Sequence, residues 1–66
     1  MIRRIEVMQT RVGDSMSFRS FQLGDFYNGK EIKHIELRDD GWAYLSRGTD
    51  IILMVNQDRI ELCEMR

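Results

Sequence analysis

The sequence predicts an all-β fold: a small antiparallel meander of five or six strands that forms a barrel or a strongly twisted sheet. Turn residues (Gly, Asn and Asp) recur about every 8–12 residues, which is typical of all-β domains. Apolar and polar residues alternate in several of the segments between these turns. One segment, residues 51–55, is apolar throughout and has the length of a strand.

The apolar segment is Ile51-Ile52-Leu53-Met54-Val55. Its Ile and Val residues favour a strand, and it is too short for a stable helix. Because it does not alternate, we expect both of its faces to be covered. In so short a chain, that requires a closed barrel or a partner subunit.

The residue pattern of the N-terminal third predicts two strands. In residues 2–12, Ile5 and Val7 share one face, whereas apolar residues from Met8 onward occupy the other, so we expect a bulge near Met8. A turn at Gly13-Asp14-Ser15 follows. Residues 16–23 predict the second strand, and a helix within residues 14–23 is the alternative.

The remaining strands follow clear turn signals. Asn28-Gly29 predicts a tight hairpin after a short segment at Phe26-Tyr27. Residues 31–38 alternate most regularly, and residues 42–47 follow an Asp-Asp-Gly turn. After residues 51–55, a turn at 56–58 leads into the last strand, residues 59–65. An SH3-like or OB-like barrel fits this size and pattern.

Sixty-six residues form a single small β domain, residues 1–66. A domain of this size buries only about 60% of its unfolded surface and is marginally stable alone. One cysteine, Cys63, excludes an internal disulfide, and one His with one Cys does not complete a zinc site. We therefore expect a homo-oligomer, first a dimer, without metal or cofactor. No signal peptide and no run of about 20 apolar residues occurs, so we expect a cytoplasmic protein without membrane association.

We do not expect an enzyme. His34 and Glu36 share a strand face and form a conceivable general-base pair, but an ordinary exposed position is the preferred interpretation of His34. The sequence has no phosphate loop, metal-ligand spacing or nucleophile elbow. No catalytic residue is therefore assigned.

An Arg-Gly turn, Arg47-Gly48, precedes the apolar strand by two residues. This segment resembles the second signature of Sm-like RNA-binding proteins, over about ten residues of the chain. The resemblance implies a small barrel in which Arg47 and Gly48 help to frame a base-binding pocket. The first signature of that family, with its spaced Gly, Asp and Asn, is not recognisable upstream, and here a further strand follows.

Aromatic residues are the other candidate binding groups. Trp42 and Tyr44 share one strand face, opposite Ala43 and Leu45, and form either core or an exposed hot spot. Aromatic rings can stack on nucleic-acid bases where basic residues surround them, and the basic neighbours here are Arg19, Lys30, Lys33 and Arg47. The predicted binding residues are Trp42, Tyr44, Arg47, Gly48, His34 and Tyr27.

Several features favour a protein partner. The terminal strands, residues 2–12 and 59–65, are expected to expose edges that pair with another chain. Residues 1–33 carry six basic and four acidic side chains (net +2), and residues 34–66 carry four and seven (net −3), which permits head-to-tail contacts. Four methionines would suit an adaptable apolar interface: Met8, Met16, Met54 and Met65.

We therefore predict a non-catalytic binding module that self-associates and binds a protein partner; a role as an inhibitor of that partner would suit it. Its size class is typical of accessory proteins of phages and other mobile elements. The alternative is an Sm-like RNA- or nucleotide-binding protein that uses the Arg47-Gly48 turn and the face of Trp42 and Tyr44.

Overall fold

The structure, a computed structural model, describes residues 1–13 and 15–65, with the backbone alone at residues 10–12. Described residues form strands and one 3₁₀ turn, which confirms the all-β prediction. Residues 15–22 are strand, so the alternative helix is wrong there; Asp14 lies outside the described residues. The elements are β1 (Ile2–Val12), β2 (Ser15–Gln22), β3 (Phe26–Tyr27), β4 (Lys30–Glu31), β5 (His34–Leu37), β6 (Trp42–Arg47), β7 (Asp50–Asn56), η1 (Gln57–Arg59) and β8 (Ile60–Met65).

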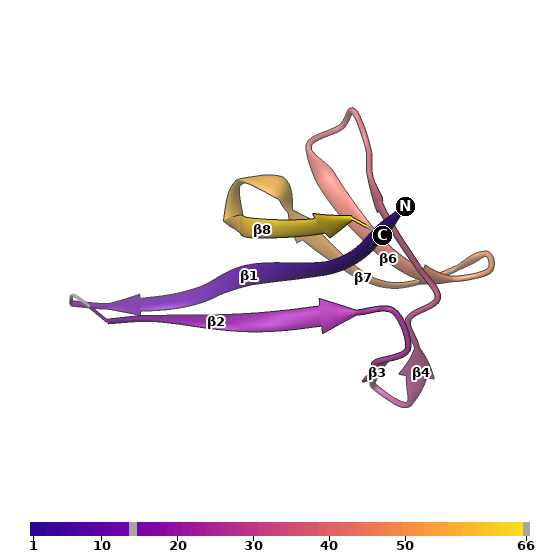
Figure 1. The fold of residues 1–66 in the computed structure, drawn as a ribbon, viewed down its shortest axis with the longest axis horizontal. Coiled ribbons are helices and arrows are strands. Elements are labelled where there is room, and N and C mark those ends of the chain that lie inside the picture. The colour runs from indigo at the N-terminus through magenta and orange to yellow at the C-terminus, as the bar shows by residue number, and fades with distance from the viewer. Residues whose placement is uncertain (14, 66) are drawn as a thin grey trace.

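These strands form three small antiparallel sheets, in the orders β2-β1-β8, β3-β4 and β5-β6-β7. In the described part of the chain, the sheets do not close into a barrel (Figure 1). The strand count exceeds the expected five or six because β3 and β4 are separate strands of two residues each.

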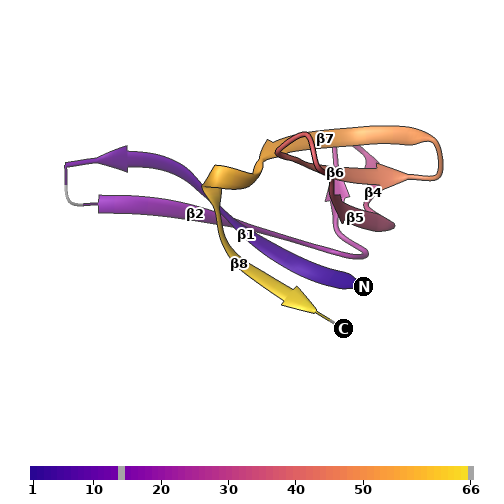
Figure 2. The same ribbon diagram turned by 90° about the horizontal axis from the view of Figure 1, so that it is seen from above.

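The long hairpin of β1 and β2 extends well past the other strands (Figures 1 and 2). Its register shifts between Met8 and Thr10, which confirms the predicted bulge. The ladder between β1 and β8 ends at the pair Val7–Ile60. Residues 8–13 and 15–18, here called the arm, therefore lie beyond the three-stranded part of this sheet.

The hairpin of β3 and β4 confirms the Asn-Gly prediction. Asn28 and Gly29 both have positive φ, 52° and 78°, as a tight two-residue turn requires. The chain then breaks at Ile32, whose backbone bonds to the turn at Gly24 and Asp25. An unbroken strand would place Ile32 on the face opposite Ile35, and the break lets both side chains enter the core.

The core lies between the two three-stranded sheets. Ile5 of β1, Leu45 of β6 and the loop residue Ile32 are fully buried at its centre. Alternation explains this arrangement, because the inward positions of β1 and β6 carry the apolar residues. The remaining buried members are Val7, Phe21, Ile35, Ala43 and Val55.

The apolar strand β7 departs from expectation. It lies at the edge of its sheet, and Ile51 and Met54 are 49% and 44% exposed. The single chain therefore does not cover both faces of this strand, so the closed barrel expected to do so is not found among the described residues, and cover by a partner subunit stays a prediction. Within β7, Val55 is buried in the core, and Ile52 and Leu53 pack against the core while partly buried. Ile51 and Met54 stay exposed because one small sheet cannot bury every side chain of so apolar a strand.

The terminal strands also differ from expectation. β1 is the central strand of its sheet, paired with β2 on one side and β8 on the other. Residues 2–7, which pair with β8, therefore have no free edge for another chain. β8 is an edge strand, as expected. The physical reason is that the chain returns after η1 and lays β8 against β1 (Figure 1).

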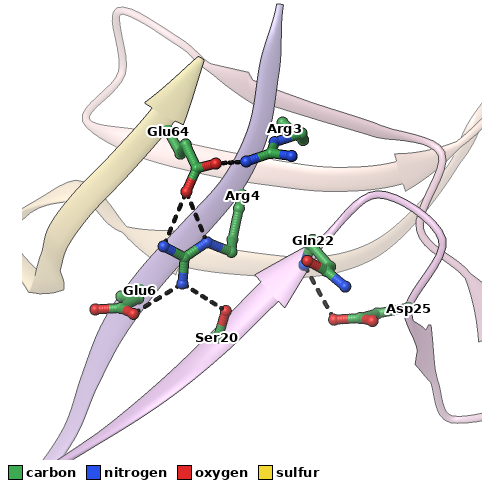
Figure 3. Close-up of polar contacts among 7 residues, drawn as sticks. All are labelled: Arg3, Arg4, Glu6, Ser20, Gln22, Asp25 and Glu64. Carbon is green, nitrogen blue, oxygen red and sulfur yellow. Dashed lines mark hydrogen bonds and ion pairs between the residues drawn. The ribbon is translucent and has the colours of Figure 1, made fainter. Parts of the chain in front are cut away.

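A polar network on the first sheet fastens its three strands together (Figure 3). Arg4 of β1 donates from Nε and Nη2 to Oε2 of Glu64 on β8, at 3.0 and 2.9 Å. Its Nη1 reaches Glu6 Oε1 at 2.8 Å and Ser20 Oγ of β2 at 3.4 Å. Arg3 also pairs with Glu64. These contacts fix which residues of β8 face β1.

Candidate binding groove

A groove with a volume of about 570 Å³ opens between the two three-stranded sheets. It takes residues from both sheets, from β3 and from the turn η1. Its size lies within the range of about 300–1,000 Å³ that is typical of ligand sites. The lining residues are Val7, Met8, Gln9, Arg19, Phe21, Tyr27, Trp42, Leu53, Met54, Val55, Asn56 and Arg59.

The groove runs along the edge of β7. Four consecutive residues of this strand, Leu53–Asn56, line it. Successive side chains of a strand point to opposite faces, so an uninterrupted run of lining residues indicates that the strand presents its edge. β7 is the last strand of its sheet, and an edge strand carries unpaired backbone groups. The groove therefore offers backbone hydrogen-bonding groups as well as apolar side chains.

A cation and two aromatic rings form one wall of the groove. The Arg19 guanidinium carbon lies 4.9 Å from the centre of the Phe21 ring and 5.2 Å from that of Tyr27. The two rings meet edge to face, with their centres 6.0 Å apart. These cation–π contacts hold the Arg19 side chain against the wall.

The groove is positively charged. Arg19 and Arg59 line it, and none of the acidic residues that the structure describes does so. Within residues 1–13 and 15–65, neither arginine takes part in an ion pair. Both guanidinium groups are thus available to an anionic ligand.

The structure separates the predicted pair Trp42 and Tyr44. Trp42 is 37% exposed and lines the groove, next to the end of β7 at Asn56. Tyr44 is 8% exposed and lies outside the groove. Trp42 is therefore accessible to a partner, whereas Tyr44 belongs to the packing of the sheet.

Tyr44 closes the turn between β5 and β6. Its hydroxyl donates a hydrogen bond to Asp40 Oδ2, and Asp40 Oδ1 accepts from the Trp42 backbone N–H at 3.0 Å. The guanidinium carbon of Arg38 lies 3.8 Å from the centre of the Tyr44 ring. The hydrogen bond from Tyr44 lowers the pKa of Asp40, and the same bond raises the pKa of Tyr44. This cluster positions the backbone of Trp42 at the mouth of the groove.

The Arg47-Gly48 turn lies at the other end of β6 from Trp42. The two ends of this strand are roughly 16 Å apart. Gly48 has a φ of 58°, which the tight turn to Asp50 requires. Arg47 and Gly48 do not line the groove, whereas Tyr27 does.

His34 lies on β5, which forms the edge opposite β7 in the sheet β5-β6-β7. Its Nε2 is 3.7 Å from Glu36 Oε2, and both side chains are about half exposed. The predicted proximity of these two residues is confirmed, and they lie on an open surface away from the groove.

Sequence reasoning did not single out Arg59 or the edge at Leu53–Asn56 as binding groups. Arg19 was recognised only as a basic neighbour of aromatic residues. An apolar run too long for its sheet to bury was the available signal for the edge. The position of Arg59 followed from no pattern, because it depends on how η1 turns the chain between the sheets.

Among the described residues, no group of three or more His, Cys, Asp and Glu side chains is arranged to hold a metal ion. A search of the same residues finds no helix with the length and hydropathy needed to span a bilayer. Comparisons with protein-family models, with curated proteins and with solved structures each returned no match.

Proposed function

We propose that this protein is a non-catalytic binding module that binds a protein partner in the groove beside β7. One observation carries the proposal: the most apolar strand of the chain is an edge strand, and its edge lines the groove. Edge strands bind other chains by extending the sheet, with main-chain bonds for affinity and pockets for specificity. Trp42 and Tyr27 supply the aromatic anchors that such interfaces favour.

Self-association is part of the proposal, with a second copy of the chain covering Met16 and Phe18 on the arm. These two side chains are exposed and do not line the groove, whereas Met8 and Gln9 at the base of the arm do. A domain of this size gains much of its stability from any added apolar burial. The dimer, the cytoplasmic location and the role as an inhibitory accessory protein of a phage or mobile element remain predictions.

A native mass spectrum of the protein, purified gently from its own host, tests the proposal. We expect an oligomer that retains a second polypeptide, and retention should resist nuclease and added salt. A bare monomer, or a passenger of a few hundred daltons per subunit, would overturn it. The self-association is tested separately by the melting temperature, which should rise with protein concentration over a hundredfold range.

A nucleotide or single-stranded nucleic acid is the second candidate ligand. Trp42, Arg19 and Arg59 in one groove without carboxylates favour it, because aromatic rings stack on bases and arginines bind phosphates. The Arg47-Gly48 turn lies elsewhere, so such a ligand would use Arg19 and Arg59. In the same mass spectrum, an oligonucleotide ladder sensitive to nuclease would support this candidate.

A further inference from the structure

We infer that the groove accepts one particular kind of partner segment: an extended peptide with alternating apolar residues and acidic residues beside them, which adds to β7 as a further strand. This inference rests on the proposed function and specifies the chemistry of the partner. Its three requirements, an extended backbone, apolar side chains and negative charge, each correspond to a separate feature of the groove.

The extended backbone follows from the edge of β7. A peptide that lies against Leu53–Asn56 can exchange main-chain hydrogen bonds with the strand only if it is itself extended. The opposite wall supports the same geometry. Val7, Met8 and Gln9 of β1 also line the groove consecutively, at the place where the ladder to β8 ends. The groove is thus bordered by two strand segments, and its volume of about 570 Å³ lies within the range of ligand sites.

The apolar requirement follows from the core residues that line the groove. Val7, Phe21 and Val55 belong to the hydrophobic core and also line the groove. Alternate side chains of an added strand would point toward these residues and cover them. Trp42, at the mouth, would pack against the side chain at one end of the peptide.

The acidic requirement follows from charge complementarity. Among the described residues, Arg19 and Arg59 are the charged ones that line the groove, and neither is neutralised by an ion pair there. Arg19 extends from β2 and Arg59 from η1, so they lie on two different elements that border the groove. Carboxylates on the peptide would bind these guanidinium groups with charge-assisted hydrogen bonds. A basic peptide would place further positive charge beside the two arginines and bind poorly.

A display library of random 12-residue peptides, selected on the immobilised full-length protein, tests the inference. We expect the enriched peptides to share alternating apolar residues with Asp or Glu. A labelled synthetic copy should bind at least tenfold more weakly to the Arg19→Gln/Arg59→Gln variant. The matched control, Lys33→Gln/Arg47→Gln, removes the same charge outside the groove and should bind like the wild type. Unchanged melting temperatures of both variants would show that they fold.

Main-chain pairing has its own readout. N-methylation of alternate peptide bonds in the synthetic peptide should weaken binding at least tenfold in one of the two registers and little in the other. The inference is overturned if no peptide is enriched, if the enriched peptides lack acidic residues, or if N-methylation in both registers leaves binding unchanged. Binding of a uridine hexamer that quenches Trp42 fluorescence and requires both arginines would overturn it in favour of a nucleic-acid ligand. If one of the three peptide outcomes overturns the inference but the native mass spectrum still shows a retained polypeptide, the proposed function stands.

Discussion

The guanidinium of Arg19 lies 5.2 Å from the centre of the Tyr27 ring, which brings a cation from β2 and an aromatic ring from β3 to the same wall of the groove. The contact depends on the hairpin of β3 and β4, because the positive φ angles of Asn28 and Gly29 form its tight turn. A local turn in the sequence thereby shapes the surface that we assign to binding.

Removing the hydroxyl of Tyr44 should change how stability depends on alkaline pH. The pKa of Tyr44 is raised above its ordinary value of 10.0, mainly by the hydrogen bond to Asp40. As pH rises past 10.0, the unfolded chain loses this proton first, so the free energy of unfolding falls. In Tyr44→Phe this contribution is absent at every pH. Thermal melts between pH 8 and 11 should show a lower melting temperature for the variant at pH 8 and a difference that shrinks toward pH 11. A constant difference would contradict the assignment.

Replacing Arg4 should loosen the first sheet. Arg4→Met removes the hydrogen bonds to Glu64, Glu6 and Ser20, and we expect a loss of about 1 kcal/mol in the free energy of unfolding. The loss should be smaller in 1 M NaCl because salt screens the ion pairs. Lys33→Met is the control, since its exposed pair with Glu31 spans 3.8 Å and should contribute little. Urea unfolding measures both variants, and equal losses would argue against a special role for Arg4.

Truncating the core should destabilise the protein strongly. Leu45 is fully buried, so Leu45→Ala should cost about 2–5 kcal/mol. This is a large part of the roughly 3–10 kcal/mol expected for a domain of this size. The exposed Leu62 on β8 provides a matched control, and Leu62→Ala should change stability by less than about 0.5 kcal/mol. Urea unfolding followed by circular dichroism should show a much lower midpoint for the first variant alone. Equal midpoints for both would place Leu45 outside the core.

Exchanging the apolar residues of the arm should prevent self-association. The double variant Met16→Thr/Phe18→Thr keeps residues compatible with β2 but removes exposed apolar surface. We expect it to sediment as a monomer at concentrations where the wild type forms a dimer. If both sediment alike as dimers, the second copy binds elsewhere.

The sequence predicted those parts of the fold that depend on local chemistry. The dipeptide Asn28-Gly29 predicted the hairpin between β3 and β4, and the change of apolar face near Met8 predicted the bulge. The arrangement of the sheets was not predictable in the same way, because alternation says which face of a strand is inward but not which strands are neighbours. The prediction placed β1 at an edge, and the structure places it between β2 and β8.

The candidate site was predictable only in part. Trp42 and Tyr27 were named and line the groove, whereas Tyr44 is held by Asp40 and Arg47 lies at the far end of β6. Neighbouring positions on one strand face looked equivalent in the sequence. Their difference arises from the turn at Asp40, which buries one ring and leaves the other at the groove. The sequence pattern does not contain that tertiary information.

The central claim, that the edge of β7 binds a protein, is tested most directly by two matched variants. Met54 on β7 and Leu37 on β5 are 44% and 42% exposed on opposite edges of the same sheet, and only Met54 lines the groove. Each is changed to Asp, and the polypeptide that copurifies from the host is quantified by mass spectrometry. We expect Leu37→Asp to retain the partner at the wild-type level and Met54→Asp to lose it, with equal melting temperatures for the two variants. Retention by Met54→Asp, or loss by both, would contradict the claim.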